Sequence, residues 1–140
     1  MGTDSGKNIS VKAAIPYVAL GGAIGAGLRY LMLELSPFSD DYSYLVIMAE
    51  NVAGAFLLGL LAGLIARTKV KSWPWAPFLG TGILGSFTTF STFVADILYL
   101  GSTSLAVASL YIAGSVVAGL FTAILGFSLG SAQKTRGGFQ

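Results

Sequence analysis

Residues 76–100, APFLGTGILGSFTTFSTFVADILYL, form an apolar segment of the length that a helix needs to cross a bilayer. The centre of this segment, GILGSFTTFSTF at residues 82–93, is unusual for a membrane anchor because it combines glycines, phenylalanines and hydroxyl side chains. Glycine and threonine weaken a helix, and hydroxyl groups offer the backbone alternative hydrogen-bond partners. The segment can therefore bend or break at this point, and the residues alone slightly favour a bend.

Three further apolar stretches of similar length lie at residues 13–35, 45–66 and 105–130. The chain has 140 residues, of which 54% are hydrophobic and only 10% charged, and its mean hydropathy is +0.78. Soluble domains carry about 25% charged residues, so this composition indicates an integral membrane protein. The connections are too short for a soluble domain. The sequence therefore predicts an all-α fold in which residues 1–140 form a single domain of four transmembrane helices.

Several functional classes are excluded by residue types that the sequence lacks. There is no cysteine and no histidine, which removes disulfides, thiolate or imidazole metal sites and the usual catalytic triads. The sequence also has no phosphate-binding loop and no nucleophile beside a base, so we expect no enzymatic activity. The net charge of +2 is too small to suggest nucleic-acid binding.

The distribution of basic residues predicts the orientation of the chain. With four spans, the N-terminus, the second connection and the C-terminal tail all lie on one side of the membrane. The first and third connections contain no lysine or arginine, and this bias predicts that both termini are cytoplasmic in the cell membrane. The basic residues on the predicted cytoplasmic side are Lys7, Lys12, Arg67, Lys69, Lys71, Lys134 and Arg136.

Phe90 and Phe93 are three residues apart and so share a helix face, next to the hydroxyls of Ser91 and Thr92. Aromatic ring edges carry partial positive charge, so rings presented edge-on favour an anion without binding it as tightly as a lysine would. Phenylalanines at this spacing also pack against lipid or a neighbouring helix. The spacing alone favours packing and leaves anion contact open.

Four polar residues within the apolar stretches are candidates for function. Arg29 either reaches the membrane interface or attracts anions, and Asp96 caps a helix, pairs with Arg29 or faces water. Asn51 has two amide donors for an anion or for another helix, whereas Glu50 suits a cation or a proton better. Because adjacent helical residues point about 100° apart, we do not expect Glu50 and Asn51 to line the same surface.

Hydroxyl and small residues also follow helical spacing. A polar stripe in the fourth stretch serves either as interhelical glue or as a hydrogen-bonding track for an ion. Two GxxxG pairs allow close helix packing, and because a four-helix unit has few interior positions we also expect an oligomer. The stripe consists of Tyr111, Ser115, Gly119 and Thr122, and the pairs are Gly59 with Gly63 and Gly126 with Gly130.

Together these segments resemble the fluoride ion channel family (Fluc, also called CrcB). The resemblance covers all four stretches in order, as GGAIGAGLRY, ENVAGAFLLG, GILGSFTTFSTFVAD and YIAGS. The third segment is the most specific, because GxxGxxTTFSTF is followed by an acidic residue three positions later. The resemblance implies an antiparallel dimer of four-helix subunits that passively exports fluoride from the cytoplasm.

The resemblance also implies particular site residues. In the family the third helix breaks at mid-membrane, and backbone carbonyls at the positions of Gly85 and Thr88 hold a structural sodium ion (Na+) between the subunits. Arg29 matches the first-helix arginine of the family. Together with Glu50 and Asp96, which are singled out from this sequence rather than by the resemblance, it is expected to set the electrostatics of the vestibule. The residues expected to line the fluoride pore are Asn51, Phe90, Ser91, Thr92, Phe93, Tyr111 and Ser115.

The sequence departs from the family pattern at several points. Glu50 stands where the family usually has an apolar residue, and Asp96 replaces a glutamate. Ser86 replaces a glycine, and Gly119 replaces a hydroxyl residue of the track. The strong charge bias also differs from that of dual-topology homodimers, so a heterodimer with an oppositely oriented paralogue is an alternative to a homodimer.

Two other functions stay open at this stage. A small four-helix, proton-coupled cation or drug antiporter, similar in size to the small multidrug resistance class, would use Glu50. A non-transporting helper subunit would conduct fluoride only together with a partner.

Overall fold

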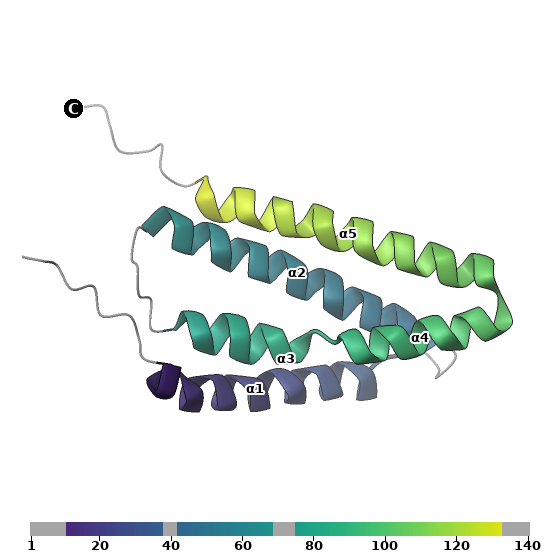
Figure 1. Cartoon of the computed structure of the whole chain (residues 1–140), viewed down its shortest axis with the longest axis horizontal. Helices are drawn as coiled ribbons and strands as arrows, with labels where there is room; N and C mark the ends of the chain where they lie inside the picture. Colours follow the sequence, from purple (N-terminus) through teal and green to yellow (C-terminus); the bar gives the residue numbers. More distant parts are fainter. Residues whose placement is uncertain (1–10, 38–41, 69–74, 133–140) are drawn as a thin grey trace, which may run out of the picture.

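The computed structural model describes residues 11–37, 42–68 and 75–132, so of the basic residues used to predict orientation only Lys12 and Arg67 lie in the described part. Four helical segments are long and apolar enough to cross a membrane, with Pro77–Thr103 taken as one, which confirms the predicted four spans. The helices, shown in Figure 1, are α1 (Val11–Glu34), α2 (Ser43–Thr68), η2 (Pro77–Leu84), α3 (Gly85–Phe87), α4 (Phe90–Thr103) and α5 (Leu105–Ser131).

Helices α2 and α5 lie side by side along much of their length and form the most extensive helix contact (Figure 1). Glycines make this contact possible, because a methyl group at Gly59 would overlap the carbonyl of Ala123 and one at Gly126 would overlap the carbonyl of Phe56. Gly63 and Gly130 approach the opposite helix in the same way. The two GxxxG pairs found in the sequence therefore pack two helices of one chain together.

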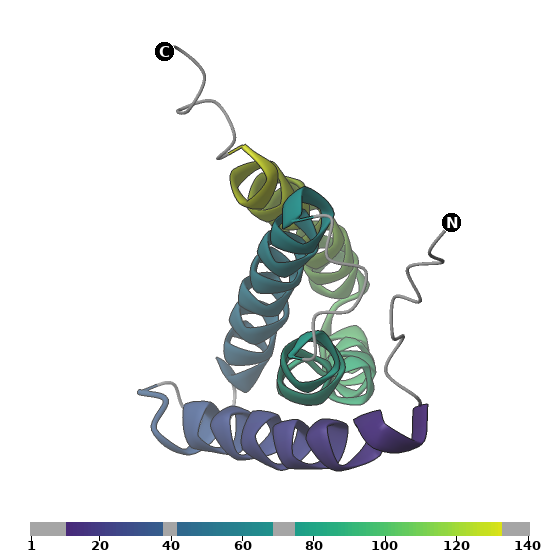
Figure 2. The same ribbon diagram turned by 90° about the vertical axis from the view of Figure 1, so that its left-hand side faces the viewer.

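Helix α1 packs across the first half of the third span, which is viewed end-on in Figure 2. A methyl group at Gly21 would overlap the carbonyl of Phe78, and one at Gly25 would overlap the carbonyl of Ile83. Gly21 and Gly25 thus form a further small-residue pair, which brings the two backbones into close contact. This contact fixes the position of the third span just before its centre.

The third span changes its helical geometry before its centre. Residues Pro77–Leu84 form the π-helix η2, which the sequence analysis did not predict. Pro77 suits the first turn because its missing N–H would have no helical partner there. Short π-helical segments occur frequently at functional sites, and this one leads directly into α3.

The backbone of the third span leaves the helical conformation at two residues. Thr88 has φ −76° and ψ 152°, and Thr89 has φ −141° and ψ 126°, so both are extended. The joined third helix nevertheless bends by only 19°. The residues alone left a bend and a break open, and the resemblance implies a break at mid-membrane. The structure shows a small bend with a local loss of helical backbone at these two residues, and the break at mid-membrane stays a prediction.

The described interior is small, and much of the apolar surface faces outward. One buried cluster, made by Leu100, Ala108 and Tyr111, is covered by Phe93 and other apolar side chains where α4 meets α5. On the outer faces, Leu98 is 70% exposed and Phe121 is 67% exposed. Outward-facing side chains of this kind are expected for helices that contact lipid.

Candidate functional site

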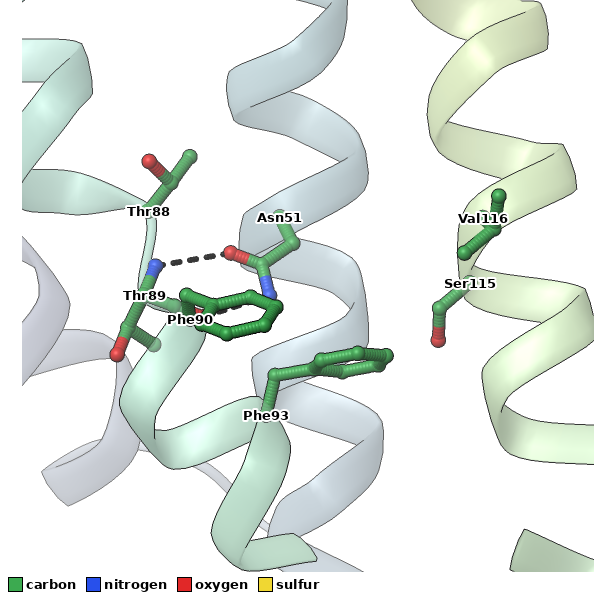
Figure 3. Close-up of a pocket in the computed structure, with 7 residues that line it drawn as sticks. All are labelled: Asn51, Thr88, Thr89, Phe90, Phe93, Ser115 and Val116. Carbon is green, nitrogen blue, oxygen red and sulfur yellow. Dashed lines mark hydrogen bonds between the residues drawn. The ribbon is translucent and has the colours of Figure 1, made fainter. Parts of the chain in front are cut away.

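The amide of Asn51 in α2 bonds to the backbone of the interrupted third helix. The Thr89 N–H donates to Asn51 Oδ1 over 2.9 Å, and Asn51 Nδ2 donates to the Thr89 carbonyl over 3.1 Å (Figure 3). One amide thus satisfies both backbone groups of an extended residue, groups that are costly to leave unpaired in lipid. The carboxamide is suited to this role because it carries a donor and an acceptor side by side.

Threonine hydroxyls satisfy the helix ends on either side. Thr88 donates its hydroxyl to the Leu84 carbonyl over 2.9 Å, which holds the end of α3. Thr89 is the N-cap of α4, since its hydroxyl oxygen accepts from the Thr92 N–H over 3.3 Å. This is the usual way in which a threonine begins a helix.

These bonds release two backbone carbonyls from the helical pattern. In a continuous helix the Gly85 carbonyl would accept from Thr89 N–H, and the Thr88 carbonyl would accept from Thr92 N–H. Here Thr89 N–H donates to Asn51, and Thr92 N–H donates to the Thr89 hydroxyl. Gly85 and Thr88, the two residues whose carbonyls were predicted to hold sodium, therefore both lose their helical donors.

We call the two extended residues Thr88 and Thr89 the interruption of the third helix. A pocket of about 320 Å³ lies against this interruption. Figure 3 shows the Phe93 ring extending from α4 toward Ser115 on α5, with Asn51 of α2 beside it. The Ser115 hydroxyl oxygen is buried and has no hydrogen-bond partner among the described residues. The pocket is lined by Asn51, Thr88, Thr89, Phe90, Phe93, Ser115 and Val116.

The aromatic rings of the site form a connected series. The Phe93 ring lies 5.2 Å from Tyr111 and 6.2 Å from Phe90, measured between centroids. Phe90 is 78% exposed, whereas Phe93 is partly buried and Tyr111 is buried. Phe93 is therefore the ring that both lines the pocket and has its position set by packing.

Other predicted pore residues lie outside the pocket lining. The hydroxyls of Ser91 and Thr92 lie 3.3 and 3.1 Å from the Thr89 hydroxyl, within the helix cap. Tyr111 donates its hydroxyl to Asp96 Oδ2 over 3.1 Å. Among the possibilities weighed for Asp96, the structure thus gives it a partner on α5 rather than Arg29.

The polar stripe of α5 divides into parts with different partners. The Thr122 hydroxyl lies 2.9 Å from the Ala118 carbonyl of its own helix and 3.2 Å from the Val52 carbonyl of α2. It therefore links α5 to α2 by a hydrogen bond. Ser115 faces the pocket, and Gly119 has open space around its α-carbon. Only the part of the stripe around Ser115 belongs to the candidate site.

Glu50 and Arg29 are also not part of the pocket lining. Glu50 is fully buried, with a relative exposure of 0%, while Arg29 is half-buried on α1. The expectation that Glu50 and Asn51 line different surfaces agrees with this arrangement. Neither oxygen of Glu50 has a hydrogen-bond partner among the described residues.

Thr89 lies at the centre of the site but was not among the predicted site residues. A threonine immediately before a helical stretch is a recognisable N-cap signal, and Thr89 directly precedes the stretch that begins at Phe90. Val116 was missed as well, because an apolar residue on an apolar helix gives no signal that separates a pocket wall from a lipid-facing position.

Comparison with known proteins places the chain in a family. The family model described as CrcB-like protein, Camphor Resistance (CrcB), matches residues 16–127. A Fluoride-specific ion channel FluC from Oceanobacillus iheyensis is 42% identical over 113 residues, which cover 80% of this chain and 87% of the relative. The Fluoride-specific ion channel FluC 1 of Rhodococcus jostii is 36% identical, with coverage of 87% and 89%.

A third relative, the Fluoride-specific ion channel FluC of Paracoccus denitrificans, is 41% identical, with coverage of 81% of this chain and 90% of the relative. The matched region includes all four helical spans, apart from the first residues of α1 and the last of α5. The chain therefore belongs to the CrcB family, a family of multi-pass membrane transporters rather than enzymes.

Proposed function

We propose that this protein is a fluoride-selective channel that lets fluoride leave the cytoplasm passively. The observation that carries the proposal is the pocket in which the Phe93 ring, the Asn51 amide and the unpartnered Ser115 hydroxyl come together. Its relatives are named as fluoride-specific ion channels, and the pocket's donors suit a small anion that accepts strong hydrogen bonds.

The donors in the pocket are few and none is a cation. The Ser115 hydroxyl is free to donate, and Asn51 Nδ2 uses one of its two hydrogens on Thr89, so the second is available. The edge of Phe93 adds a weak positive potential. Conduction requires binding that replaces hydration yet remains weak enough for release, and a set of neutral donors meets both needs.

Ion efflux from proteoliposomes tests this function. Vesicles that contain the purified protein are expected to release fluoride rapidly, as read by a fluoride electrode, and to retain chloride. Fluoride concentrates its charge on a smaller ion and therefore gains more from the neutral donors. Protein-free vesicles measure the leak of hydrogen fluoride through the lipid. Equal release of fluoride and chloride, or fluoride release that does not exceed this leak, would rule out a fluoride-selective channel.

The alternative function of cation or drug antiport has little support from the geometry. It depends on Glu50, which is fully buried. A drug-sized cation would have to displace the surrounding core to reach this carboxylate. The proposed fluoride path uses Asn51, Phe93 and Ser115 and does not require access to Glu50.

The proposed assembly is an antiparallel dimer with a structural sodium ion at its centre. Gly85 and Thr88 fit such a site, because the N–H groups that their carbonyls would accept from in a helix bond elsewhere. Carbonyl oxygens are hard ligands suited to an alkali cation, and two carbonyls per chain become four when two interruptions face each other. The ion would neutralise these dipoles and hold the two interruptions together.

Native mass spectrometry of the purified protein tests this assembly. We expect the mass of two subunits with one retained sodium ion, and a second polypeptide of different mass would identify a heterodimer with an oppositely oriented paralogue. Protease access to terminal tags separates the two assemblies. If every copy of this chain has its N- and C-termini cytoplasmic in the cell membrane, as the charge bias predicts, the antiparallel partner is the paralogue and both tags are cleaved from one side only, whereas an antiparallel homodimer exposes tags on both sides. A monomer without sodium would contradict the assembly.

A further inference from the structure

The most unusual group in the described part of the protein is the carboxylate of Glu50. It is fully buried, neither oxygen has a hydrogen-bond partner within residues 11–37, 42–68 and 75–132, and its neighbours Val46 and Ile47 on α2 are buried as well. An ionised carboxylate in such a place loses its hydration without gaining any bond in return. A neutral carboxyl group is tolerated there far better.

The surrounding charges do not compensate for this burial. Arg29 of α1 attracts the carboxylate electrostatically, but the two groups form no ion pair within 4.0 Å. η2 and α3 contribute no titratable side chain, Asp96 of α4 is hydrogen-bonded to Tyr111 of α5, and the nearest titratable group on α2 itself is Tyr44. An arginine that forms no ion pair with the carboxylate repays only part of the desolvation cost.

We propose that Glu50 is a proton-binding site, and that loss of its proton suppresses fluoride conduction. The proton bonds to one carboxylate oxygen and is exchanged with water when the helices open transiently. The Glu50 oxygens bond to neither Gly85 nor Thr88, so the proton site is separate from the proposed sodium ligands. The coupling to conduction rests on the proposed fluoride channel, whereas proton binding itself does not.

The position of Glu50 explains how its charge would affect an anion. It immediately precedes Asn51, whose amide both bonds to Thr89 and lines the pocket. A negative charge on Glu50 would lie on the order of 10 Å from a fluoride ion in the pocket, and at an effective dielectric constant of about 20 the repulsion lowers occupancy about tenfold. The neutral form exerts no such repulsion.

Fluoride efflux over a range of pH tests the coupling. Wild-type flux, corrected for leak through protein-free vesicles, is expected to fall about tenfold from acidic to alkaline pH as Glu50 ionises. Glu50→Gln, which stays neutral, should keep the high flux at every pH. The matched control Glu34→Gln removes an exposed carboxylate at the end of α1 and should keep the wild-type pH dependence.

Infrared spectroscopy tests the proton site independently of transport. Wild-type protein at neutral pH should show the C=O band of a protonated carboxyl group that disappears on alkaline titration, remains in Glu34→Gln and is absent from Glu50→Gln. Should Glu50→Gln fail to fold, Glu50→Val provides a second neutral variant, and the wild-type titration alone still detects the band.

The possible outcomes separate the two proposals. A wild-type flux that does not change with pH, or a Glu50→Gln flux that falls as the wild-type flux does, overturns the coupling. Absence of the carboxyl band overturns the proton site. If neither the wild type nor any variant conducts fluoride, the proposed channel function fails. The infrared measurement then decides by itself whether Glu50 holds a proton.

Discussion

Fluoride efflux is expected to fall at least about a hundredfold when Asn51 is replaced by aspartate. Aspartate keeps an oxygen that accepts from Thr89 N–H but loses the Nδ2 donor, so its second oxygen faces the Thr89 carbonyl. Leaving a buried acceptor unsatisfied costs about 1–3 kcal/mol. The new negative charge also repels fluoride in the pocket, and the two effects together reach the roughly 2.7 kcal/mol that a hundredfold change requires.

The measurement is efflux from proteoliposomes read by a fluoride electrode, with native mass spectrometry to show that the variant assembles as the wild type does. Ser102→Ala is a suitable control, because its hydroxyl is exposed and bonds to the Tyr99 carbonyl near the end of α4. This control should conduct as the wild type does. Rapid efflux through a properly assembled Asn51→Asp variant would show that the amide neither holds the interruption nor contributes to the path.

The four spans of the fold were predictable from the sequence, because each depends on local composition, whereas the π-helix η2 was not. Stretches of about 20 apolar residues specify membrane helices regardless of their neighbours, and the four spans follow from that rule. GxxxG pairs were recognised in the same way, since small residues permit close backbone approach. Their partners were not predictable, and the structure places both pairs, Gly59 with Gly63 and Gly126 with Gly130, in the α2–α5 contact.

Some residues of the candidate site were predictable from the sequence, but their arrangement was not. Asn51, Phe93 and Ser115 were singled out as polar or aromatic residues in lipid, and all three line the pocket. The bonds between Asn51 and Thr89 join residues 38 positions apart, and no helical periodicity reports a contact at that separation. Asn51 was expected to donate either to an anion or to another helix, and the structure indicates that its amide has groups for both.

The interruption itself shows why the sequence left a bend and a break open. Glycines and threonines lower the cost of leaving the helix, but they do not determine whether other groups satisfy the freed backbone. That depends on the Asn51 amide from α2 and on the Thr89 cap. The burial of Glu50 also depends on other helices. Its position in the sequence of α2 predicts the helix face on which it lies but not the residues that surround it.

Phe93→Ile is expected to lower fluoride efflux about thirtyfold. Isoleucine fills much of the same space but has no positive ring edge to face an anion. A ring quadrupole holds a desolvated cation at its face with about 2 kcal/mol. We take the same scale for an anion at the ring edge, and about 1.4 kcal/mol corresponds to a factor of ten. The ring also contacts Phe90 and Tyr111, so its loss removes packing that fixes the pocket wall.

A matched substitution separates these effects from a general loss of aromatic surface. Phe121 on α5 is 67% exposed and lies outside the pocket, so Phe121→Ile should conduct as the wild type does. Phe93→Leu keeps the pocket apolar and also lacks a ring edge, and it should match Phe93→Ile. Restoration of efflux by leucine would mean that Phe93 acts through packing alone, whereas restoration only by another aromatic residue would assign its effect to the ring edge.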